Sequence, residues 1–126
     1  MSHFHAVVWM DHQEAHVLHF DAASFEAHRI KARSHHPRHH EGDALGQALF
    51  HEGVLKALDG AREVLLVGPG HAHDEFKAWT RRHHPDQVGR ILATEKLDHP
   101  SDAQLVALAR RQFLGIDRMA GTPTPN

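Results

Sequence analysis

Residues 63–70 read Glu-Val-Leu-Leu-Val-Gly-Pro-Gly, an aliphatic run that ends in a proline between two glycines. A short run of this kind favours a β-strand, and the glycines and the proline favour a turn directly after it. Beyond the turn, Ala72, Phe76 and Trp79 recur at helical spacing. The stretch therefore predicts a strand, a tight turn and a helix, which are the first parts of a parallel crossover.

Three more strands are predicted on the N-terminal side of this unit. Residues 5–10 are compact and apolar, and residues 14–20 follow a polar break with alternate side chains on opposite faces. Residues 25–31 form a third, more polar run. Because the links are short, we expect an antiparallel meander. A homodimer is one possibility, since a second copy of the chain could pair with or cover the edge strand of this meander.

Two helices and one strand complete the predicted pattern. The helix before residue 60 carries an apolar stripe at steps of four and three, made of Ala44, Ala48, His51, Leu55 and Leu58 and widened by Leu45 and Leu49. Residues 88–94 predict a fifth strand. Ser101 and Gln104 form the capping box of a last helix, which we expect to end at Gly115.

The predicted order βββαβαβα indicates an α/β fold with a mixed five-stranded sheet and helices packed on it, which is the ribonuclease-H-like architecture. We expect residues 1–117 to form one domain and residues 118–126 to form a flexible tail, because the tail lacks apolar periodicity. With 126 residues, 40% of them hydrophobic, the chain can build its core without a disulfide or a structural metal.

The composition excludes several classes of protein. The absence of cysteine rules out disulfide frameworks, thiolate metal sites and cysteine nucleophiles, and it suits the cytoplasm. The sequence contains no apolar run long enough to span a membrane and no recognisable signal peptide, so we expect no membrane partner. The formal charge of −2 gives no overall attraction to nucleic acid. The sixteen histidines stand out, because histidine titrates near neutral pH and commonly binds metals.

Three segments of the sequence resemble a known group of proteins. They are residues 7–11 (Val-Val-Trp-Met-Asp), residues 64–70 with the Asp-Glu-Phe-Lys of 74–77, and residues 98–102 (Asp-His-Pro-Ser-Asp). The pattern resembles the middle domain of archaeal and eukaryotic class-1 peptide-release factors and of Pelota. Nearly the whole chain is similar to a set of short bacterial proteins described as translational machinery proteins. The resemblance implies a translation-associated module whose partner is the ribosome, its RNA or a translation factor.

The loop after the predicted third strand departs from the release-factor pattern. In those factors it carries the Gly-Gly-Gln tripeptide that promotes ester hydrolysis, whereas residues 31–43 of this chain lack the tripeptide. The dipeptide Gly46-Gln47 lies inside the predicted helix instead. Peptide-release activity therefore does not carry over, and we expect a non-catalytic module rather than an enzyme.

This loop holds the candidate binding residues. Cations and titratable imidazoles could contact the phosphate backbone of ribosomal RNA. The residues concerned are Lys31, Arg33, His35, His36, Arg38, His39 and His40. An alternative is a metal-binding or pH-responsive protein, in which zinc or nickel is held by His35, His36, His39 and His40. A solvated loop without a ligand is the third interpretation.

Two basic or glycine-rich motifs have competing interpretations. The basic run at residues 81–84 either extends the loop patch or complements the dipole of the middle helix, and we favour the dipole. The Gly-Pro-Gly of residues 68–70 favours a tight turn over an anion site. His71 and His73 are two residues apart on a helix, which argues against a ligand pair.

Asp11 raises the question of a nuclease. It follows the first strand, where ribonuclease-H-like nucleases carry a metal-binding aspartate, and Glu14 and Glu26 are the candidate additional carboxylates. We favour a turn-capping role for Asp11, because the chain offers no convincing further carboxylate. The expected function is therefore binding.

Overall fold

The computed structural model of the chain describes residues 4–32 and 40–119. The elements in chain order are β1 (His5–Met10), β2 (Glu14–Phe20), β3 (Phe25–Lys31), α1 (His40–Ala57), β4 (Glu63–Gly68), α2 (Ala72–His83), a 3-10 turn (Val88–Arg90), β5 (Ile91–Lys96) and α3 (Asp102–Met119). This order confirms the predicted βββαβαβα pattern. No helix in the described part of the chain is long and apolar enough to cross a membrane.

The five strands form one mixed sheet in the order β3-β2-β1-β4-β5. The meander pairs antiparallel, and β4 pairs parallel with both β1 and β5. Val8, for example, lies opposite Val17 of β2 on one side and Leu66 of β4 on the other. The predicted α/β fold with a mixed five-stranded sheet is confirmed. The predicted edge strand is β3, in which every residue except the half-buried Ile30 is exposed.

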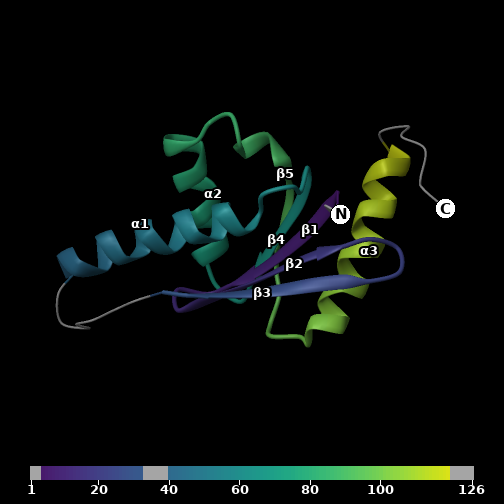
Figure 1. The fold of residues 1–126 in the computed structure, drawn as a ribbon, viewed down its shortest axis with the longest axis horizontal. Coiled ribbons are helices and arrows are strands. Elements are labelled where there is room, and N and C mark those ends of the chain that lie inside the picture. The colour runs from purple at the N-terminus through teal and green to yellow at the C-terminus, as the bar shows by residue number, and fades with distance from the viewer. Residues whose placement is uncertain (1–3, 33–39, 120–126) are drawn as a thin grey trace.

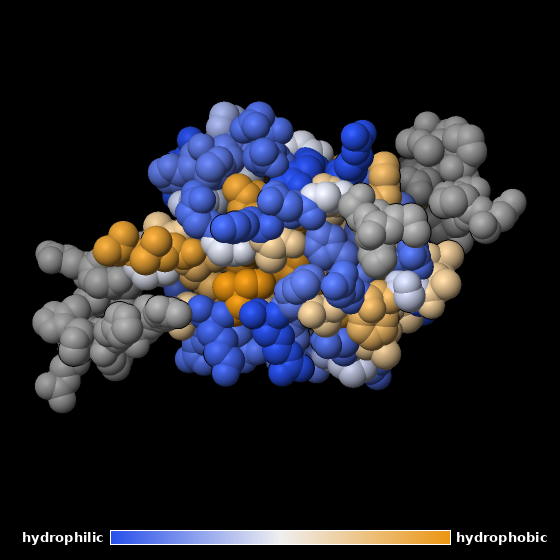
Figure 2. All heavy atoms as spheres, in the orientation of Figure 1, coloured by the Kyte–Doolittle hydropathy of each residue, from blue (hydrophilic) through white to orange (hydrophobic). Residues whose placement is uncertain are grey.

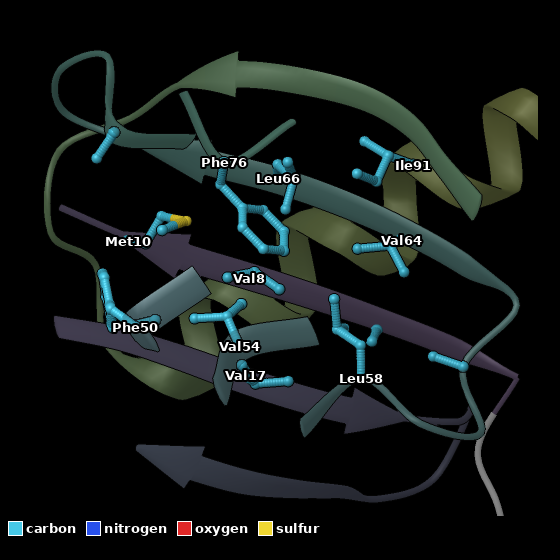
Figure 3. Packing of buried hydrophobic residues seen from close by; sticks show 14 of the residues in the cluster. Val8, Met10, Val17, Phe50, Val54, Leu58, Val64, Leu66, Phe76 and Ile91 are labelled. Carbon is cyan, nitrogen blue, oxygen red and sulfur yellow. The ribbon is translucent and has the colours of Figure 1, made fainter. Parts of the chain in front are cut away.

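Helices cover both faces of the sheet, with α1 and α2 on one face and α3 on the other (Figure 1). Beneath α1 and α2, side chains from both helices interdigitate with those of the central strands (Figure 3). The residues of this first core that Figure 3 labels are Val8, Met10, Val17, Phe50, Val54, Leu58, Val64, Leu66, Phe76 and Ile91. Beneath α3, Val7, Trp9, Leu18, Leu65 and Phe113 form the second core. Each core takes alternate residues of the strands, as the period of two requires.

The buried face of α1 differs from the predicted stripe. Leu45 and Leu49 were expected to widen that stripe, but 65% and 64% of their surfaces are exposed. The helix instead buries Phe50 and Val54, together with the predicted His51. Figure 1 shows the N-terminal half of α1 extending past the strands, and Figure 2 shows hydrophobic residues on the outside of that half. Only the C-terminal half of α1 has a sheet beneath it to pack against.

Two predicted boundaries were wrong, and one predicted cap is confirmed. The fifth strand was predicted to begin at residue 88, but residues 88–90 form a 3-10 turn and β5 begins at Ile91. In this turn, Arg90 Nη1 donates to the carbonyls of Leu58 and Ala61 at 3.1 and 2.9 Å. Helix α3 continues through Gly115 to Met119, since one glycine costs a helix only about 1 kcal/mol. At its start, the Ser101 amide donates to Gln104 Oε1 at 2.9 Å, and the Gln104 amide donates to Ser101 Oγ at 3.2 Å.

Candidate functional site

Most of the chemically interesting side chains gather at one end of the sheet, which we call the carboxyl edge. It is the edge at which β1, β4 and β5 end, along the lower side of the sheet in Figure 1. Helices α2 and α3 begin there, and β3 ends there because Lys31 lies opposite Glu14, the first residue of β2. In α/β proteins, ligands commonly bind outside the carboxyl ends of the parallel strands.

The predicted loop contacts fall mostly outside the described residues. Lys31 is described, and it lies exposed at the carboxyl edge as the last residue of β3. The backbone of His40 begins α1, but its side chain lies outside the described part of the chain. The remaining predicted contacts also lie outside it, namely Arg33, His35, His36, Arg38 and His39. Both the RNA-contact and the metal interpretation of this loop therefore stay predictions.

The turn between β1 and β2 confirms the capping role of Asp11. Its Oδ1 accepts hydrogen bonds from the amides of Gln13 and Glu14, each at 2.8 Å. Glu26 lies on the exposed edge strand opposite His19. It is roughly 17 Å along the strand from Lys31, which lies opposite Glu14 beside the turn. The structure therefore does not bring Glu26 to Asp11, and the carboxylate set considered for a nuclease does not assemble.

The same turn is held by the only Gly-Gln dipeptide of the chain. Gly46-Gln47 lies inside α1, as predicted, and Gln47 Nε2 donates to the carbonyl of His12 at 3.0 Å. His12 Nε2 lies 2.8 Å from Glu75 Oε2 of α2. The β1–β2 turn is thus tied to both helices of one face.

A cluster of ligand-type side chains lies on the other face of the carboxyl edge, and the sequence analysis did not identify it. It consists of Glu14, His16 and His99, whose potential ligand atoms all lie within 4.8 Å of one another. His16 Nε2 is 2.7 Å from Glu14 Oε1, and His16 Nδ1 is 3.5 Å from Oδ1 of Asp102. His16 is 5% exposed, whereas His99 lies in the exposed loop between β5 and α3.

Trp9 forms the inner wall of this cluster. Its ring centroid lies 5.5 Å from that of His16 and 4.2 Å from that of His99. Its indole Nε1 donates to the carbonyl of Asp98 at 3.0 Å, which fixes the β5–α3 loop against the sheet. Trp9 belongs to the core, since only 2% of its surface is exposed.

The start of α2 confirms the tight-turn interpretation of the glycine-rich segment. A Cβ added to Gly68 would lie 2.3 Å from the carbonyl oxygen of Met10, so only glycine fits at this position. His71 Nδ1 and His73 Nε2 approach different oxygens of Asp74, both at 3.6 Å. Burial lowers the pKa of His73, and Asp74 opposes that shift. Each imidazole thus faces the carboxylate rather than the other imidazole.

A small hollow of about 180 Å³ lies beside this turn. Its lining residues are Gly70, His71, His73, Asp74, Thr94, Glu95 and Lys96. Both signs of charge line it, so it does not select an anion or a cation.

The basic run at residues 81–84 lies at the C-terminal end of α2. Arg81, Arg82 and His83 occupy the last turn of α2, which runs away from the carboxyl edge. His84 Nε2 lies 2.7 Å from Glu52 Oε1 of α1. This position at the end of the helix supports the helix-dipole interpretation.

Comparison with known proteins shows a shared fold. Neither a protein-family model nor a curated protein matches the chain. Among solved structures, Archaeoglobus fulgidus Pelota matches with a TM-score of 0.64 and 13% identity over 93% of this chain and 35% of that one. The archaeal translation termination factor aRF1 matches with a TM-score of 0.60 and 12% identity over 93% of this chain and 41% of that one.

A third match is a structure described as ribosome-bound archaeal Pelota with ABCE1. Its TM-score is 0.56, with 12% identity over 91% of this chain and 33% of that one. The chain therefore spans between 33% and 41% of the length of these three proteins, and it shares the fold of the part that it matches. The predicted resemblance to release factors and Pelota is confirmed at the level of the fold.

Proposed function

We propose that this chain is a translation-associated module that binds the ribosome or a translation factor and catalyses no reaction of its own. The observation that supports the proposal is the fold match over 93% of the chain to Pelota and to a translation termination factor. A related structure is described as ribosome-bound, which supports the ribosome as the partner class. Such a module would act in the cytoplasm.

The residues of the chain support a binding role over a catalytic one. The sequence contains no Gly-Gly-Gln tripeptide, and its one Gly-Gln dipeptide holds α1 to the β1–β2 turn through Gln47. Asp11, which would have to bind metal in a nuclease, uses Oδ1 to cap that turn. The side chains of Gln47 and Asp11 therefore have structural roles.

We assign the contact surface to the loop that leaves the carboxyl edge. Lys31 is exposed at its start, and Arg33 and Arg38 follow in the sequence. The chain as a whole carries a formal charge of −2, so attraction to RNA phosphate has to come from this local group. Protonation of the loop histidines below neutral pH would add to that attraction.

The test is co-sedimentation with ribosomes in a sucrose gradient, with the protein at native abundance and a tag free of histidine. The loop variant carries alanine at five positions: His35, His36, Arg38, His39 and His40. The matched control replaces Arg81 and Arg82, which lie exposed at the far end of α2. We expect the wild type and the control in the ribosomal fractions and the loop variant at the top. Wild type at the top in every gradient, or a loop variant that still sediments, would contradict the proposal.

A further inference from the structure

A second candidate binding site lies on the α3 face of the carboxyl edge and is independent of the proposed function. Glu14, His16 and His99 come from the start of β2, the middle of β2 and the β5–α3 loop, yet their ligand atoms lie within 4.8 Å of one another. Ligand atoms around tetrahedral zinc are about 3.4 Å apart, given metal–ligand distances near 2.1 Å. Small side-chain rotations therefore suffice to place all three on one ion.

The surroundings of His16 are typical of a metal-binding histidine. Nε2 points to Glu14 at 2.7 Å, and Nδ1 points to the carboxylate of Asp102 at 3.5 Å. A histidine that binds a metal through one ring nitrogen usually donates the other N–H to a carboxylate, which orients the ring. His16 already has an inner and an outer carboxylate on opposite sides of its ring.

The electrostatics of the cluster favour a cation. Glu14 and Asp102 bring two carboxylates to one imidazole. Lys31 and Arg29 lie opposite Glu14 and His16 on β3, but within the described residues no ion pair joins either carboxylate to a lysine or an arginine. Neutral imidazole nitrogens together with one carboxylate oxygen suit zinc, nickel, cobalt or copper. Within the cluster, His16 is buried against the buried Trp9, whereas His99 is exposed. An ion bound here would therefore lie against the core and remain accessible from solvent.

We propose that Glu14, His16 and His99 bind one divalent transition-metal ion, with Asp102 as the outer-shell carboxylate. Three protein ligands leave one coordination position open towards solvent. That position could accept water or a ligand atom of a partner.

Tryptophan fluorescence provides a direct probe, because Trp9 contacts both imidazole rings. The chain has two tryptophans, so Trp79→Phe leaves Trp9 as the only emitter. The background also carries alanine at the loop histidines, to remove competing ligands: His35, His36, His39 and His40. Untagged protein in this background is titrated with nickel chloride, followed by fluorescence quenching, and with zinc chloride, followed by calorimetry.

We expect one ion per chain and quenching of Trp9 by nickel. His99→Ala, in an exposed loop, should weaken binding at least tenfold without affecting the fold, and Asp102→Asn should weaken it about 10- to 100-fold. His28→Ala is the matched control, since His28 is an exposed histidine on β3 outside the cluster. Absence of binding in this background, or binding that survives His99→Ala together with Glu14→Gln, would overturn the proposal. Ribosome sedimentation of His99→Ala is a separate measurement, so the two proposals can fail independently.

Discussion

Replacing His51 with leucine is expected to make the protein more resistant to acid. His51 is 6% exposed on α1, and its ring lies 5.5 Å from that of Phe76 and 5.4 Å from that of Trp79. Its Nδ1 is buried without a hydrogen-bond partner among the described residues. This apolar environment disfavours the charged imidazolium, and leucine has a similar volume without a group that takes up a proton.

The size of the effect follows from the pKa of His51. Burial lowers that pKa from 6.5 to about 4, with smaller lowering by His12 and Arg82 and an opposing effect of Glu75. Between these two values the unfolded chain binds a proton that the folded chain does not, so the free energy of unfolding decreases as the pH falls. One pKa unit corresponds to about 1.4 kcal/mol, so the loss from His51 amounts to about 3 kcal/mol and is complete below about pH 4.

The assay is urea unfolding followed by circular dichroism at several pH values between 7.5 and 4. Urea is suitable because it carries no charge and does not screen electrostatic interactions. At pH 7.5 the His51→Leu variant should be at least as stable as the wild type, since an unpaired buried nitrogen is removed. At pH 4 it should be more stable by about 3 kcal/mol.

The matched control is Val54→Ala, a change at a fully buried position one turn along the same helix. It should lower the free energy of unfolding by about 2 kcal/mol at every pH, because it removes apolar contacts and no titrating group. If wild type and His51→Leu lose stability in parallel between pH 7.5 and 4, His51 is not an acid-sensitive group of the core and the reasoning from its burial is wrong.

Three further variants test other features of the fold, each by urea unfolding at neutral pH. Gly68→Ala should cost about 3 kcal/mol, because its Cβ would meet the carbonyl oxygen of Met10 at 2.3 Å; a cost below 1 kcal/mol would show that the two strands can move apart. Ser101→Ala should cost about 1 kcal/mol through loss of the α3 cap, and an unchanged midpoint would contradict that role. Leu45→Ser with Leu49→Ser should change stability by less than about 1 kcal/mol, since both side chains are exposed, and a larger loss would place them in a packed surface.

The sequence by itself determined the order of the elements and the class of the fold. The short aliphatic run before Gly68, the alternation within β2 and the capping box at Ser101 depend on residues that are close together in the chain. Local patterns of this kind report local backbone preference and burial, which is why the meander, the crossovers and the polar edge strand were predictable.

Only the tertiary structure decided which side chains meet. The pattern of α1 allowed an apolar stripe that included Leu45, but that part of the helix has no sheet beneath it and the residue is exposed. The cluster of Glu14, His16 and His99 depends on the pairing of β1 with β2 and on Trp9 holding the β5–α3 loop through Asp98. Residues distant in sequence are brought together by strand register and loop packing, and neither leaves a signal in the spacing of residues along the chain.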